Sequence, residues 1–177
     1  GVYTLSTSLK LPAKVTLRGT GPGNTILRAS GSGLAGPLVE AKTPGSVTDS
    51  LIVRDLTLDN VSKNTVGGMG VDFTRVRGGI VRNVEILNCE TGLRLNEGCS
   101  RCALETSHLN QCNTGILVTG TTENPIFVRM ADVTITQPNI GIQIDSAARL
   151  TQILHCAVIA DTPLISVALK TAGQDTQ

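Results

Sequence analysis

The sequence predicts an all-β fold in which short strands coil around one axis and stack turn upon turn. Three observations support this prediction. A glycine followed by a short alternating strand recurs at nearly constant intervals, at 70–73, 92–95, 115–118 and 141–144. A repeat of this length is typical of coiled repeat architectures. A second strand precedes each copy at a fixed offset, and no segment has the periodicity of an amphipathic helix.

The second strand lies at the same short distance before the start of each motif. Its first and third residues are mostly apolar and its middle residue is mostly polar, as in a strand with one buried face. Its copies are 56–58, 84–86, 107–109, 133–135 and 156–158, and a motif copy without the glycine follows at 164–167. The pair 56–58 and 70–73 fits this scheme if 61–68 is a loop insertion. A β-sandwich, the other all-β option, does not require such a repeat.

The N-terminal part of the chain predicts the opening turns of the coil. Short strands at 2–5, 9–12 and 15–19 are separated by turn residues, and the cluster Thr20–Asn24 forms a turn before a strand at 25–27. Gly-, Ser- and Pro-rich loops at 30–36 and 43–49 enclose a strand at 38–41. From Leu51 the turns become regular. At about 23 residues a repeat, the chain 1–177 predicts one domain of about seven rungs.

Stacking places equivalent residues about 4.8 Å apart in parallel columns. Each column buries aliphatic side chains that a single turn would expose, at roughly 1.5–3 kcal/mol per side chain. Only three aromatic residues occur, and we expect Phe73 and Phe127 to point inward and Tyr3 to lie on the first rung. Three inward columns are predicted: Val71, Leu93, Ile116, Ile142, Ile165; Phe73, Leu95, Val118, Ile144, Val167; and Leu58, Ile86, Leu109, Ile135, Val158.

A polar column stands just before the second strand of each turn. It comprises Asp55, Asn83, Thr106 and Asp132. Asn and Asp tolerate turn geometry and form hydrogen bonds with neighbouring groups. We interpret this column as a structural ladder at a bend.

Five cysteines exclude a complete disulfide framework. Cys89 and Cys112 occupy one position of adjacent rungs, and Cys156 occupies an inward position, so buried free thiols are the main expectation. The Cys99–Cys102 pair has the spacing of half a zinc site, but zinc sites need further ligands at matching spacing. A zinc site and a disulfide remain alternatives for Cys89, Cys99, Cys102 and Cys112. No metal or cofactor is expected.

The middle residues of the strands point outward and supply the candidate site residues. One outward column contains Asp72 and Arg94, which we expect to form an exposed ion pair, followed by Leu117, an exposed apolar residue. A second contains Glu85 and His108, which can form either an acid–base pair or a plain surface contact. Glu97 and Glu123, at one bend on adjacent rungs, are a further carboxylate pair. The weak catalytic candidates are therefore Glu85, His108, Asp72 and Arg94.

The composition argues against several partners. The net charge is +1 with Lys and Arg spread thinly, so the sequence predicts no nucleic-acid partner. No apolar run of about 18 residues predicts a membrane span. Few aromatic side chains are left for a sugar-binding platform, although polar columns or a subunit interface can still bind an oligosaccharide.

The opening pattern Gly1-x-Tyr3-x-Leu5, Leu9-x-Leu11-Pro12, Val15-Thr16-Leu17-x-Gly19-x-Gly21 and Thr25-x-Leu27 resembles the first coils of pectate-lyase-like right-handed parallel β-helices. The stretches 51–59, 70–73 and 91–95 are also similar to that group, which contains phage tailspikes and bacterial polysaccharide-degrading enzymes. The resemblance implies a single-stranded right-handed parallel β-helix. The acidic ligand cluster of the family's calcium-dependent lyases and the paired aspartates of its polygalacturonase branch are absent.

The resemblance and the plain surface suggest a structural or receptor-recognition module of a phage tailspike-like or virion surface protein. Such a module would bind bacterial surface polysaccharide, assemble in the bacterial cytosol and form a homotrimer. No capping helix or cap is evident at either end, so a fragment of a longer chain, or capping by partner chains, is expected. The alternatives are a polysaccharide lyase or glycoside hydrolase, secreted or on the virion, and an isolated or designed fragment without its own activity.

Overall fold

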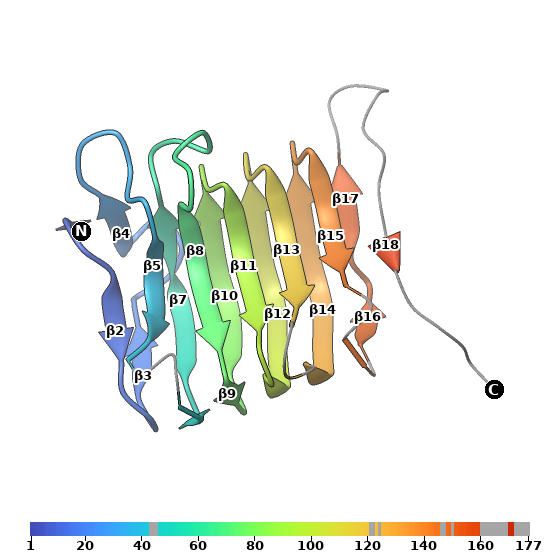
Figure 1. The fold of residues 1–177 in the computed structure, drawn as a ribbon. Helices are drawn as coiled ribbons and strands as arrows, with labels where there is room; N and C mark the ends of the chain where they lie inside the picture. Colours follow the sequence, from blue (N-terminus) through green and yellow to red (C-terminus); the bar gives the residue numbers. More distant parts are fainter. Residues whose placement is uncertain are drawn as a thin grey trace.

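The computed structural model describes residues 1–42, 46–120, 123, 125–145, 148–149, 151–159 and 170–171. These residues form an all-β coil whose strands stack side by side along one axis (Figure 1). Neighbouring strands pair in parallel from the first turns to the last. The predicted parallel β-helix is therefore confirmed. No helix in the described part of the chain is long and apolar enough to cross a membrane.

One side of the coil is a seven-stranded sheet to which each turn contributes one strand. Its strands are β2 (Leu9–Leu11), β5 (Pro37–Ala41), β8 (Met69–Thr74), β11 (Thr91–Asn96), β13 (Thr114–Thr119), β15 (Ile140–Ile144) and β18 (Lys170–Thr171). The glycine motifs at 70–73, 92–95, 115–118 and 141–144 all fall on these strands. From the first to the last of these seven strands the chain makes about six full turns, in agreement with the prediction of about seven rungs.

The second sheet has eleven strands and bends along its length. They are β1 (Val2–Leu5), β3 (Thr16–Arg18), β4 (Ile26–Ala29), β6 (Thr48–Asp49), β7 (Ile52–Asp59), β9 (Val76–Arg77), β10 (Ile80–Leu87), β12 (Ser100–Asn110), β14 (Ile126–Thr136), β16 (Gln152–Leu154) and β17 (Ala157–Ile159).

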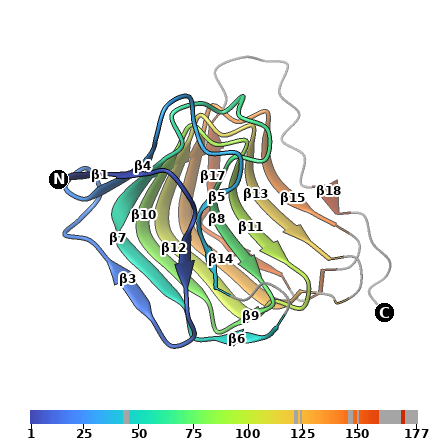
Figure 2. The same ribbon diagram turned by 60° about the vertical axis from the view of Figure 1, so that its left-hand side comes forward.

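Each long strand of this sheet turns a corner at an equivalent residue. The corner residues have positive φ angles: Asp55 (59°), Asn83 (51°), Thr106 (46°) and Asp132 (55°). The polar column predicted at a bend is therefore confirmed. We call the part of the sheet before this bend the first arm and the part after it the second arm. Together with the seven-stranded sheet they form three sides around a common interior (Figure 2).

The interior consists of the predicted aliphatic columns. Ile116 pairs in register with Leu93 on one side and Ile142 on the other, and Ile135 pairs with Leu109 and Val158. Ile116 and Ile135 are fully buried. Ile165 and Val167, the last members of two columns, lie outside the described residues. The sequence repeat therefore encodes a continuous dry core.

The repeating glycine is a packing requirement. A Cβ atom at Gly115 would lie 2.5 Å from the carbonyl oxygen of Gly141 and 2.8 Å from a methyl carbon of Ile135. A Cβ atom at Gly92 would lie 2.6 Å from the carbonyl oxygen of Gly115 and 2.6 Å from a methyl carbon of Leu109. The glycine thus lets the core side chain of the second arm reach across to the seven-stranded sheet.

Gly115→Ala should therefore destabilise the coil by about 2 kcal/mol, because overpacking a close contact typically costs about 1–3 kcal/mol. Urea denaturation followed by circular dichroism measures this change. Gly36→Ala is the matched control, since its Cβ would meet only the Ser8 hydroxyl, at 3.6 Å. Equal midpoints for both variants would contradict the packing role.

Two expectations about apolar side chains are wrong. Phe127 does not point inward: it is 58% exposed and has a φ of 56°. The next residue, Val128, is buried, and alternation sends Phe127 outward. Leu117 is half-buried, because it lies between Arg94 and Gln143 in the stacked sheet.

All five cysteines are free thiols, which confirms the main expectation, and the disulfide alternative is wrong. Cys99 donates its S–H to the carbonyl of Phe73 at 2.8 Å, and Cys102 to that of Val76 at 3.3 Å. Interaction with Cys112, together with burial, raises the pKa of Cys89. The described residues contain no group of three or more His, Cys, Asp or Glu side chains arranged for a metal ion. These thiols behave as core side chains.

Candidate functional site

The four candidate residues lie in two separate places. Asp72 and Arg94 are on the outer face of the seven-stranded sheet, whereas Glu85 and His108 are on the outer face of the second arm. Register explains both pairs, because Asp72 aligns with Arg94 across β8 and β11, and Glu85 with His108 across β10 and β12. The structure therefore brings each pair together but does not combine the pairs into one site.

The Asp72–Arg94 pair is closed and internally satisfied. Arg94 donates two hydrogen bonds to the Asp72 carboxylate, at 3.0 and 2.7 Å, and the Thr74 hydroxyl donates a third at 3.1 Å. Asp72 is only 7% exposed, so the expectation of an exposed ion pair is wrong. The hydrogen bond to Asp72 raises the pKa of Arg94. A carboxylate covered in this way stabilises the sheet and offers no free oxygen to a substrate.

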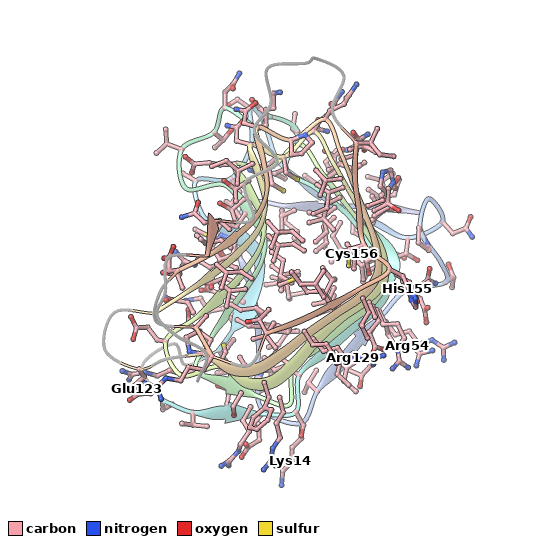
Figure 3. All side chains as sticks on the ribbon, turned by 90° about the vertical axis from the view of Figure 1, so that its right-hand side faces the viewer. Lys14, Arg54, Glu123, Arg129, His155 and Cys156 are labelled. Carbon is pink, nitrogen blue, oxygen red and sulfur yellow. The ribbon has the colours of Figure 1, made fainter. Side chains whose placement is uncertain are left out.

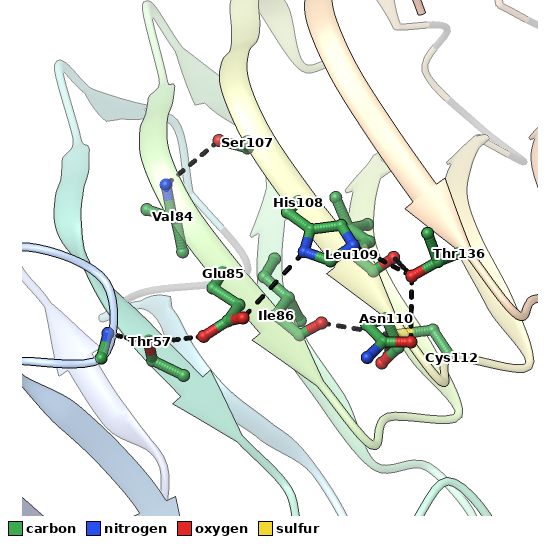
Figure 4. Close-up of polar contacts among 11 residues, drawn as sticks. Thr57, Val84, Glu85, Ile86, Ser107, His108, Leu109, Asn110, Cys112 and Thr136 are labelled. Atoms are coloured by element: carbon green, nitrogen blue, oxygen red, sulfur yellow. Dashed lines mark hydrogen bonds and ion pairs between the residues drawn. The ribbon is translucent and has the colours of Figure 1, made fainter. Parts of the chain in front are cut away.

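Glu85 and His108 belong to a polar chain that crosses four turns of the second arm (Figure 4). The Thr57 hydroxyl donates to Glu85 Oε2 at 3.0 Å. Glu85 Oε1 lies 4.0 Å from His108 Nδ1, and His108 Nε2 lies 2.9 Å from Thr136 Oγ1. The side chains of Glu85 and His108 are 31% and 41% exposed, so both are held in place while remaining open to solvent.

The hydrogen bonds indicate which ring nitrogen of a neutral His108 carries the proton. The Thr136 hydroxyl donates to Asn110 Oδ1 at 2.9 Å, so it accepts a hydrogen bond from the Nε2–H of His108. In the neutral imidazole this leaves the lone pair of Nδ1 facing the Glu85 carboxylate. Protonation of Nδ1 creates an ion pair at this position. Glu85 and His108 therefore face each other as the carboxylate and imidazole of an acid–base pair do.

A loop walls one end of this surface. Residues 20–25 fold over the second arm, where Gly21 N–H donates to the Asp55 carbonyl and Gly23 N–H to the Thr57 hydroxyl, both at 2.8 Å. Thr57 is buried beneath the loop. The groove beside the wall has a volume of about 350 Å³ and is lined by Pro22, Asn83, Val84, Glu85, Thr106, Ser107, His108, Asp132 and Thr134. Seven of its nine lining residues have polar side chains, and Pro22 forms an apolar edge.

The sequence did not identify every part of this groove. It predicted a turn at 20–24 but gave no signal that this turn would cover Thr57 and form a wall. The contact of His108 with Thr136 was also missed, because that hydroxyl lies beyond the aligned Thr134 on the same strand.

The other acidic candidates form local contacts. Glu97 accepts a hydrogen bond from the backbone N–H of Glu123 at 3.1 Å, and the Glu123 carboxylate lies 3.7 Å from Arg75. Glu105 binds both Arg82 and Arg129. The contacts of Glu97 and Glu123 therefore stabilise the bend at which these two residues lie.

Comparisons with known proteins identify the fold. No family model matches the chain, and no curated protein matches its sequence. Among solved structures, ORF18 of Geobacillus virus E2 superposes with a TM-score of 0.65 at 12% identity over 88% of this chain. The A-module of mannuronan C-5 epimerase AlgE4 from Azotobacter vinelandii matches with a TM-score of 0.41 at 14% identity, also over 88%.

The fold that the chain shares with the viral protein is a parallel β-helix. The chain spans 39% of the length of the viral protein and 66% of that of the epimerase module. At this level of identity the likeness concerns the fold alone, and many functions share this scaffold.

Proposed function

We propose that this chain is the β-helix module of a phage tailspike-like or other virion surface protein and that it binds bacterial surface polysaccharide. The observation that carries the proposal is the polar groove on the second arm, built on a rigid stack of strands. The fold likeness to a Geobacillus virus protein supports the virion assignment.

The groove suits a carbohydrate because its polar groups include both donors and acceptors. Carboxylates of Glu85 and Asp132 accept hydrogen bonds, the amide of Asn83 donates and accepts them, and hydroxyls of Thr106 and Thr134 do both. Pro22 offers an apolar edge for the face of a sugar ring. Because successive turns are one strand spacing apart, a chain molecule lying along the axis meets an equivalent group at each turn.

The test is binding of polysaccharide purified from the surfaces of candidate host bacteria. We expect Glu85→Gln combined with His108→Ala to weaken binding about tenfold or more, because a hydrogen bond to a charged group contributes about 1.5–3 kcal/mol. Isothermal titration calorimetry measures the affinity.

Gln143→Ala is the matched control, since Gln143 points outward from the seven-stranded sheet and its side chain contacts Asp145. Equal affinity of the groove variant and the control would exclude the groove as the binding site.

A polysaccharide lyase or glycoside hydrolase is the second candidate, favoured by the Glu85–His108 contact of 4.0 Å. In this case His108 transfers the proton and Glu85 stabilises the imidazolium. We expect release of reducing ends or unsaturated sugars from the bound polysaccharide, and His108→Ala to slow it by about a hundredfold or more. Activity that survives this change would remove the pair from the reaction.

We also propose that the module forms a homotrimer whose subunits pack side by side and bury outward columns, as symmetric assemblies commonly do. Its place would be the virion tail or surface. Multi-angle light scattering of the purified chain should give three times the monomer mass of 18.5 kDa. A monomer at working concentration would contradict the trimer.

A further inference from the structure

Basic residues that are far apart in the sequence lie together on the outer face of the first arm. Arg18, Arg54 and Arg82 align in register on three neighbouring strands. With the bend and the short strands β6 and β9, this surface carries eight cations against four anions, whereas the whole chain has a net charge of +1. We call it the basic face: Lys14, Arg18, Arg54, Arg77, Arg82, Arg101, Arg129 and Arg149, with Asp49, Asp55, Glu105 and Asp132. Figure 3 shows Lys14, Arg54 and Arg129 outside the coil along one side.

The carboxylates of this face are too few to neutralise all of its arginines. Asp55 Oδ2 is shared by Arg18 at 3.2 Å and Arg54 at 2.8 Å. Glu105 is likewise shared by Arg82 at 2.6 Å and Arg129 at 2.9 Å. Asp55 and Glu105 thus each serve two guanidinium groups, whereas, in the described part of the chain, Asp49 pairs with Arg77 alone. The four arginines that share a carboxylate remain 37% to 66% exposed.

Stacked like charges destabilise a sheet, so this arrangement is not explained by folding stability. When like charges are aligned on a surface at a cost in stability, the arrangement indicates a functional role. The surplus charge is positive, and a complementary ligand is therefore an anion with charges that repeat along the coil axis.

An exposed aromatic ring lies within the same face. Phe127 occupies the corner at which β14 enters the first arm, and Arg101 occupies the equivalent corner one turn earlier, with φ angles of 56° and 54°. On the following turn the carbonyl of Arg149 accepts the N–H of Phe127 at 3.3 Å. An exposed Phe at positive φ is unusual. Here it lies between the strand positions of two exposed arginines.

We propose that the basic face binds an acidic polysaccharide, with the sugar chain running across the strands and its carboxylates on the arginine rows. The Phe127 ring contacts the apolar face of a sugar, while the guanidinium groups of Arg101 and Arg149 bind its carboxylate. Arginine forks match carboxylates in geometry, as Arg77 already does with the two oxygens of Asp49 on this face. The inference rests on the proposed function, names the class of its polysaccharide and adds a second contact surface, on the first arm, to the groove of the second arm.

Charge alone would also fit a nucleic acid, but the aromatic content favours a sugar chain. Single-stranded nucleic acids bind through several rings on which successive bases stack. In the described part of the basic face Phe127 is the one aromatic side chain. Arginines aligned on three neighbouring strands, about 4.8 Å apart, match a linear polymer with regularly spaced acid groups.

The test uses polygalacturonate and hyaluronate as charged polymers and fully methyl-esterified polygalacturonan as an uncharged polymer with the same backbone. We expect the protein to bind at least one polyuronate and not the ester, and the affinity to fall on the order of tenfold between about 50 and 200 mM salt. Arg101→Glu combined with Phe127→Ala should weaken binding at least about fivefold. Biolayer interferometry measures each affinity, and thermal melts verify that the variants are folded.

Lys10→Glu is the matched control, because it makes the same change of charge at an exposed side chain of the seven-stranded sheet and should leave binding unchanged. Equal binding of the ester, tighter binding of single-stranded DNA, binding of neither polyuronate, or equal affinity of the variant and the control would each overturn the inference. Binding of a bacterial surface polysaccharide that depends on Glu85 and His108 would still support the proposed function. A chain that binds no bacterial polysaccharide would fail the proposed function itself.

Discussion

Replacement of Ile116 by lysine is expected to prevent folding of the coil. Ile116 is fully buried and stacks between Leu93 and Ile142, so a lysine there loses the aliphatic contacts and brings a charge into a dry core. Losing the side chain alone costs about 2–5 kcal/mol, and a buried unpaired ammonium adds several more. This sum reaches the total stability of a typical domain, about 5–15 kcal/mol. We expect insoluble protein, or soluble protein without a cooperative thermal transition.

Leu117→Lys is the matched control at the next residue. Leu117 points outward and is half-buried, so its lysine can extend into solvent while keeping its aliphatic stem on the sheet. This variant should fold with a cooperative transition. Ile135→Lys should behave like Ile116→Lys, because Ile135 is fully buried in the column of the second arm. A stable, cooperative Ile116→Lys protein would contradict the stacked core.

The contrast between Ile116 and Leu117 explains why the fold was predictable from sequence. Period-two alternation separates inside from outside within a strand, and a repeat of nearly constant length superposes equivalent strands. Glu85 and His108 were predicted to be neighbours for the same reason, since one repeat separates them in the sequence. Wherever the turns have constant length, sequence spacing and spatial register carry the same information.

The basic face was not predictable because the early turns differ in length. Arg18, Arg54 and Arg82 are separated by stretches of unequal length, so no fixed period connects them. Only strand pairing shows that they are aligned. The net positive charge of the basic face is also not visible in the composition, because acidic residues on the other faces balance it.

Phe127 was misassigned for a different reason. It lies between Ile126 and Val128, and three apolar residues in a row do not reveal which of them points inward. The corner at Phe127, with its positive φ, precedes a strand in which Val128 faces the core. The groove wall at Pro22 was missed because a turn prediction gives local geometry and not the surface on which the turn rests.

Removal of the Arg94 side chain is the second change expected to have a large effect. Arg94→Ala leaves the Asp72 carboxylate, 7% exposed in the native sheet, without its two strongest donors. Asp72 also lies next to the aligned carboxylate of Glu40. Breaking a buried pair on one side typically costs about 3–5 kcal/mol, and we expect about 3 kcal/mol because Arg94 remains partly exposed. Urea denaturation measures the loss.

Lys10→Ala tests the same kind of contact in the same column. Lys10 lies 3.5 Å from Glu40 but its side chain is 57% exposed, so its loss should cost at most about 1 kcal/mol. Adding Asp72→Asn to Arg94→Ala should restore part of the stability, because an uncharged amide is cheaper to bury than an unpaired carboxylate. Equal losses for Arg94→Ala and Lys10→Ala, or no recovery in the double variant, would mean that burial of Asp72 does not control the strength of this pair. In that case the column would be an ordinary row of surface charges, and its residues would again be available as a binding surface on the seven-stranded sheet.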